Sequence, residues 1–68
     1  MINQNRNLID LAHKFHAELP ERIRQYLNAR GIPDELIERH LLGWNGWRIT
    51  IPIFDRAGEL AFFKQARD

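Results

Sequence analysis

The spacing of hydrophobic residues changes in the second half of the chain, from a helical period to a strand period. Apolar residues three or four positions apart predict an amphipathic helix over residues 8–18, with Asn7 as its N-cap. A second helix is predicted over residues 20–30, with Pro20 in its first turn and Gly31 as its left-handed stop. A third helix is predicted over residues 34–41, and Gly43 is expected to end it.

Residues 47–54 alternate with a period of two, which predicts a β-strand. Trp47 and the three isoleucines of this strand share one face, and Thr50 and Pro52 lie on the other with Arg48. Residues 55–58 are typical of a turn, and a second strand follows over residues 59–65. The pattern therefore predicts an α+β fold, with three short helices followed by a β-hairpin in one small domain over residues 1–68.

The predicted hairpin is small for a complete sheet. A two-stranded hairpin is only marginally stable in water, and Pro52 cannot donate a hydrogen bond to a neighbouring strand. The second predicted strand is followed by no polar tail, because the sequence stops at Asp68. Either the helices cover this hairpin or the sheet continues in residues outside this sequence. We expect the second, an incomplete sheet that belongs to a larger domain.

Composition narrows the function classes. The 68 residues contain no cysteine, so neither a disulfide nor a thiolate metal site can stabilise the fold. No apolar run approaches the length of a membrane span, and the first residues lack the basic and apolar regions of a signal peptide. We therefore expect a cytoplasmic protein without a membrane partner.

The residue types give little support for catalysis or for metal binding. The sequence has neither serine nor cysteine, the commonest nucleophiles. His13 and His16 are three residues apart on the first helix, but no third metal ligand has an obvious place beside them. His40 shares the spacing of Leu36 and Ile37, so we expect it at the edge of the core. The sequence predicts no catalytic residue, metal ligand or cofactor within this chain.

Binding of phosphate is the stronger hypothesis, although the net charge is only +1. Eight of the ten Lys and Arg residues are arginine, whose planar guanidinium suits phosphate oxygens. Such cations grip a sugar-phosphate backbone without reading bases. A solvated surface is the alternative interpretation, and for Trp44 and Trp47 a place in the core is favoured over stacking on bases. The candidate nucleic-acid-binding residues are Arg30, Arg48, Lys64 and Arg67.

The order of residues along the chain resembles the start of the bacterial DNA primase catalytic core. Residues 26–44 read YLNARGIPDELIERHLLGW, against a family pattern of YL..RG(I/L)..E.I..F.LGY. Residues 48–63 are similar to the family's next segment, R(V/I)..PI.D..G....F. The chain departs from the pattern at His40 and Trp44, which stand where the family has Phe and Tyr, and the span between Trp44 and Arg48 is short for a cellular primase.

This resemblance implies a subdomain that precedes a TOPRIM domain and, with it, forms a groove for a single-stranded DNA template. Arg30 and Arg48 match basic residues of that groove, whereas Arg67 lies one position beyond the family's next arginine. Divalent metal, Mg²⁺, and nucleotide addition are then expected in the parent enzyme rather than in these residues. Weakly bound single-stranded DNA, the TOPRIM domain and a replicative helicase are the implied partners. The alternative from the residues themselves is a protein-interaction module that pairs through the exposed edge of the hairpin.

Overall fold

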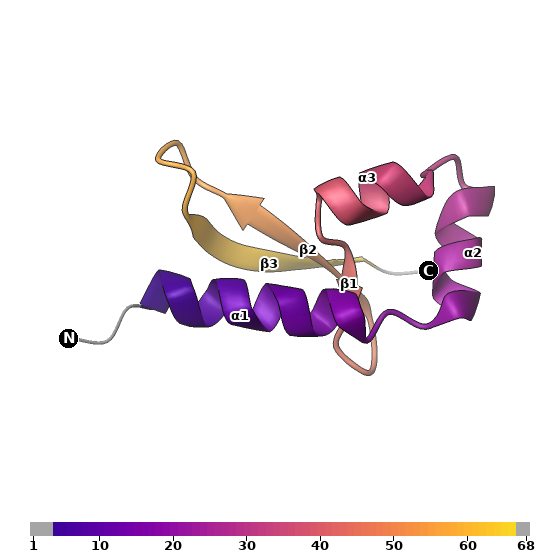
Figure 1. The fold of residues 1–68 in the computed structure, drawn as a ribbon, viewed down its shortest axis with the longest axis horizontal. Helices are drawn as coiled ribbons and strands as arrows, with labels where there is room; N and C mark the ends of the chain where they lie inside the picture. Colours follow the sequence, from indigo (N-terminus) through magenta and orange to yellow (C-terminus); the bar gives the residue numbers. More distant parts are fainter. Residues whose placement is uncertain (1–3, 67–68) are drawn as a thin grey trace.

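The computed structural model describes residues 4–66 and contains three helices followed by a three-stranded antiparallel sheet (Figure 1). The α+β prediction is therefore confirmed, and one short strand, β1, is added to the predicted hairpin. The strands lie in the order β1-β2-β3. In chain order, the elements are α1 (Gln4–Ala17), α2 (Glu21–Ala29), α3 (Asp34–Arg39), β1 (Gly43–Trp44), β2 (Ile49–Phe54) and β3 (Leu60–Ala66).

Both α2 and α3 end in the same left-handed turn, but only one of them uses glycine. Gly31 follows α2 with φ +91°, as predicted, and the Ile32 N–H donates to the Leu27 carbonyl at 3.0 Å. After α3 the equivalent position is Leu41, with φ +52°, and the Leu42 N–H donates back to Ile37. The prediction that Gly43 ends this helix is wrong, because the chain has already turned two residues earlier.

Three further expectations about the helices are corrected. Helix α1 begins at Gln4, so Asn7 lies inside the helix rather than at its N-cap. His40 is the C-cap of α3 and is exposed, so it does not pack at the edge of the core. Pro20 precedes α2 in an extended conformation, with ψ 150°, and is its N-cap rather than part of the first turn.

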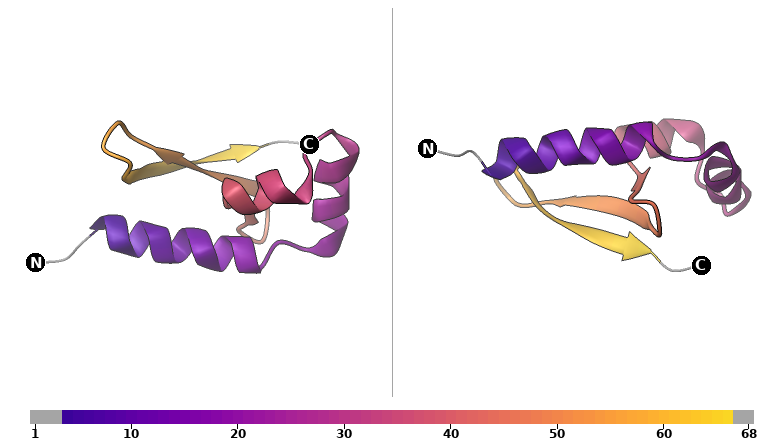
Figure 2. Two further views of the ribbon diagram at one scale, coloured as in Figure 1. Left: turned by 45° about the horizontal axis from the view of Figure 1, so that its top comes forward. Right: turned by 90° about the horizontal axis from the view of Figure 1, so that it is seen from below.

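Helix α1 covers one face of the sheet, as the edge-on view in Figure 2 shows. Phe63 of β3 meets Phe15 of α1 with ring centroids 5.4 Å apart, and Pro52 lies directly opposite Phe63 in the β2–β3 register. Residues opposite each other in an antiparallel pair point to the same face, so Pro52 also points toward α1. Thr50, two residues before Pro52, is 1% exposed, and Pro52 is buried as well, so this face of β2 is buried over residues 50–52.

The isoleucine face of β2 is only partly covered. Ile49 belongs to the core cluster formed with Leu27, Ile37 and Leu42, so α2 and α3 close this end of the face. Farther along, Ile53 is half-buried and its partner on β3, Phe62, is 55% exposed. The predicted alternation of the strand is present, but β2 is buried from both faces at its start and open on the isoleucine face toward its end.

The connection between β2 and β3 forms as predicted. The Asp55 carboxylate accepts hydrogen bonds from the backbone N–H groups of Ala57 and Glu59, at 2.9 and 3.0 Å. Gly58 donates to the Asp55 carbonyl and has φ +80°. Pro52 sits in the part of β2 that β1 does not pair with, since β1 reaches only Ile49 and Thr50. Its missing N–H is therefore tolerated at an edge of the ladder.

Candidate nucleic-acid interface

One stripe of α2 carries two arginines on either side of a tyrosine. Arg22, Tyr26 and Arg30 are spaced four residues apart, so they lie on one side of the helix. The Arg22 guanidinium carbon is 5.5 Å from the centre of the Trp44 ring on β1, and that of Arg30 is 5.5 Å from the Tyr26 ring. These are cation–π distances, and they hold both arginines against flat aromatic surfaces. We call these three residues the α2 stripe.

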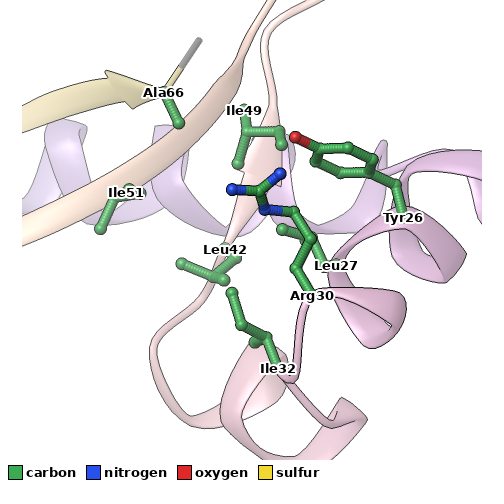
Figure 3. A pocket seen from close by; sticks show the side chains of 8 residues that line it. All are labelled: Tyr26, Leu27, Arg30, Ile32, Leu42, Ile49, Ile51 and Ala66. Carbon is green, nitrogen blue, oxygen red and sulfur yellow. The ribbon is translucent and has the colours of Figure 1, made fainter. Parts of the chain in front are cut away.

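Two residues of the α2 stripe, Tyr26 and Arg30, line a groove of about 220 Å³ between α2 and the isoleucine face of the sheet. Figure 3 shows the Arg30 guanidinium reaching from the end of α2 to a position beside Ile49 and the Tyr26 ring. Apart from Arg30 and Tyr26, the side chains around the groove are aliphatic. The lining residues are Tyr26, Leu27, Arg30, Ile32, Leu42, Ile49, Ile51 and Ala66. The groove therefore offers one fixed cation beside an apolar surface.

The other predicted cations are placed differently. Lys64 is exposed and lies opposite Ile51, so it shares the face that lines the groove. Arg48 lies in the β1–β2 connection, residues 45–48, with its guanidinium carbon 4.3 Å from the centre of the Trp47 ring. Ile51 is three residues from Arg48, which separates Lys64 from Arg48 by roughly 10 Å along the strand. Arg67 is outside the described residues.

The structure thus brings Arg30 and Lys64 to one face, with Arg48 at the end of the sheet rather than in the same cluster. Arg22 was missed by the sequence reasoning, although its spacing from Tyr26 and Arg30 was a readable signal. Trp47 was expected in the core, and this is wrong, since its side chain is 71% exposed. Trp44 is half-buried and packs against the core as expected.

Ion pairing separates Arg24 from the other arginines of α2. Its guanidinium lies 3.4 Å from carboxylate oxygens of both Asp34 and Glu38, so it joins α2 to α3. Partial burial lowers the pKa of Arg24, but hydrogen bonds and charges from these two acids outweigh that effect and raise it. The ion pairs that the structure describes in detail involve Arg24 or His16. The cations without a carboxylate partner within residues 4–66 include Arg22, Arg30, Arg48 and Lys64.

His16 has a structural position rather than one suited to a metal. Its Nδ1–H donates to the Leu42 carbonyl at 2.8 Å, and its Nε2 lies 3.3 Å from a Glu38 carboxylate oxygen. Both ring nitrogens are therefore engaged, and α1 is tied to α3 and to the residue before β1. Across the described residues, no group of three or more histidine or carboxylate side chains is arranged to hold a metal ion.

No helix within residues 4–66 combines the length and the apolar composition needed to cross a lipid bilayer. Comparisons with protein-family models, with curated proteins and with solved structures gave no match to this chain. The functional interpretation therefore depends on the residues and their geometry.

Proposed function

We propose that this chain is the single-stranded DNA-contacting subdomain of a DNA primase core and acts in primer synthesis during DNA replication. The observation that carries the proposal is the α2 stripe beside the groove, where Arg22 and Arg30 are held on aromatic rings without a described carboxylate partner. Arginines in this state keep their donors available for phosphate oxygens. The motif resemblance over residues 26–44 supports the same function, since it includes Arg30.

The separation of the two arginines suits a strand that runs along α2. Eight residues of helix separate Arg22 from Arg30, which corresponds to about 12 Å along the axis. A single strand can therefore contact both guanidinium groups, and Lys64 lies opposite Ile51, which lines the groove together with Arg30. Contacts of this kind fix the position of the backbone and leave the base sequence unread. Binding is accordingly weak and independent of sequence.

Catalysis is assigned to the parent enzyme. Nucleotide addition requires carboxylates that hold divalent metal ions. In this proposal a TOPRIM domain supplies those acids and Mg²⁺ and forms the opposite wall of the template groove. A replicative helicase is a further candidate partner of such an enzyme, and the cytoplasm is its place of action. This chain would contribute template contacts only.

The test is fluorescence anisotropy of a labelled oligo-dT strand, titrated with protein at several salt concentrations. The Arg22→Ala/Arg30→Ala variant should bind more weakly than wild type. Its plot of log affinity against log salt should be shallower by about 0.7 for each phosphate that the protein no longer neutralises. The matched control is Arg39→Ala/Arg56→Ala, which removes the same charge from exposed positions in α3 and in the β2–β3 turn. Equal affinities and slopes for the two double variants would refute the proposed surface.

A second candidate function is supported by the uncovered edge of β3. This strand is seven residues long, contains no proline and pairs only with β2 among the described residues. Such an edge can accept a strand from a partner protein. Sedimentation would distinguish the two functions, because self-association or partner binding through this edge should persist at high salt, whereas phosphate binding should not.

A further inference from the structure

The β1–β2 connection, residues 45–48 at the bottom of Figure 1, carries an aromatic side chain that the fold does not use. Trp47 is 71% exposed, more than any other large hydrophobic side chain of the described residues. The other tryptophan, Trp44, is different, because its ring packs against the core cluster and lies under Arg22. Because Trp47 adds nothing to the core, its position calls for a different explanation.

The backbone beneath Trp47 is held firmly. The Asn45 side-chain oxygen accepts hydrogen bonds from the N–H groups of Trp47 and Arg48, at 2.9 and 2.8 Å. The Asn45 N–H donates to the Arg48 carbonyl at 3.2 Å, and Gly46 provides the left-handed turn with φ +95°. Three hydrogen bonds within four residues limit the conformations of the loop. A ligand that binds Trp47 therefore has little loop entropy to remove.

Arg48 defines the chemistry of this exposed ring. Its guanidinium carbon lies 4.3 Å from the centre of the Trp47 ring, which is a stacking distance on one side of the indole. The high exposure of Trp47 leaves the other side accessible. Arg48 has no carboxylate partner among the described residues, so a positive charge lies directly beside a free aromatic surface. This combination matches an unpaired base flanked by its phosphate.

We propose that Trp47 is a stacking platform for an unpaired base of a single-stranded nucleic acid. Arg48 contacts the adjacent phosphate, and Asn45 is a positioning residue that fixes the backbone of both residues. This inference rests on the proposed function, because it assumes that a strand held by the α2 stripe continues to the β1–β2 connection. A hydrophobic protein partner fits the site less well, since Arg48 occupies part of the ring surface that such a partner would cover.

The test compares two strands of equal length, oligo-dT and an abasic strand that has the same sugar-phosphate backbone without bases. Trp47→Ala should lower the affinity for oligo-dT by about 5- to 150-fold, the range for loss of one stacked base. Its affinity for the abasic strand should change less than about twofold. Trp47→Phe should retain most of the oligo-dT affinity. Phe62→Ala, which truncates another exposed aromatic on the sheet, is the control and should have little effect.

The outcomes separate the two proposals. If Trp47→Ala binds oligo-dT as well as wild type does, while Arg22→Ala/Arg30→Ala binds it weakly, the platform is refuted and the proposed function stands. If wild type binds neither strand at low salt, both proposals are refuted. If tryptophan emission changes with protein concentration in the absence of DNA, and the change is lost in Trp47→Phe, a second copy covers the Trp47 ring, and this would also overturn the platform.

Discussion

Replacing Gly43 with alanine should destabilise the protein strongly, although the glycine has an ordinary backbone conformation. A Cβ added at this position would lie 2.5 Å from the Phe15 carbonyl carbon and 2.7 Å from the His16 nitrogen. Both are backbone atoms of α1, so no side chain can rotate to make room. Because β1 approaches α1 this closely, the two elements must separate to accommodate even one methyl group.

The magnitude follows from that separation. Ordinary van der Waals contact begins at 3.4 Å, so β1 has to retreat by about 0.9 Å, the difference between 3.4 and 2.5 Å. Overpacking of this kind costs about 1–3 kcal/mol. The same retreat would stretch the 2.8 Å hydrogen bond from His16 to Leu42, which contributes about 0.5–1.5 kcal/mol. We expect a total loss of about 2–4 kcal/mol, which lowers the melting temperature of a domain of this size by roughly 8 °C or more.

The assay is thermal and urea denaturation followed by circular dichroism, with Gly46→Ala as the matched control. Gly46 has φ +95° but open space around it, so alanine there should cost only the backbone term of about 1–2 kcal/mol. Gly43→Ala carries no such backbone term, and without the clash it would be neutral or slightly stabilising. A melting temperature for Gly43→Ala at or above that of wild type would therefore refute the close approach of β1 to α1.

Two further substitutions test the interior and the helix pair. Thr50→Val should raise stability by about 1 kcal/mol in urea denaturation, because the Thr50 hydroxyl is buried without a hydrogen-bond partner among the described residues; a destabilised variant would mean that the hydroxyl has a partner after all. Arg24→Gln should lower the free energy of unfolding by about 0.5–1 kcal/mol, and by less at 1 M salt. The effect is small because the side chains of its partners, Asp34 and Glu38, are more than half exposed. The pKa of Arg24 is raised, so its contribution to the free energy of unfolding is complete below the ordinary pKa of arginine and is lost only above it. The difference in this free energy between wild type and Arg24→Gln should therefore be equal at pH 7 and pH 10. A difference that shrinks at pH 10 would contradict the assignment.

Features determined by neighbouring residues could be predicted from the sequence. The stop at Gly31 and the turn over residues 55–58 depend on glycine and aspartate acting within a few positions. The stripe of Arg22, Tyr26 and Arg30 was equally readable, because helical spacing alone places these side chains together. The features that the sequence pattern did not predict depend mainly on how the elements pack together. The turn that follows helix α3 depends on Leu41, which takes a left-handed conformation that glycine would adopt more easily.

Gly43 was misread for the same reason. Its role depends on the backbone of α1, which is distant in sequence, so local rules assigned the glycine to a helix end. Trp47 fits the alternation of the strand in the sequence, but β2 begins only at Ile49, and the Asn45 turn places the ring outside the ladder. Thr50 is buried because α1 covers its face, which no period-two pattern can indicate. The contacts of Gly43 and Thr50 are therefore long-range, whereas Trp47 is placed by a local turn that overrides the alternation.

Strand β1 connects the stability of the fold with that surface. Gly43 faces the backbone of α1, while the next residue, Trp44, points to the other face and lies under Arg22 of α2. The two residues of β1 therefore hold α1 on one face and the α2 stripe on the other, and the rigid Asn45 turn begins directly after them. A substitution that loosens β1 should consequently weaken the binding of single-stranded DNA, even though Gly43 contacts no ligand. In Gly43→Ala, the fractional loss of affinity for single-stranded DNA should be larger than the fraction of protein that is unfolded. The reason is that Arg22 and Trp47 would no longer be held at a fixed separation.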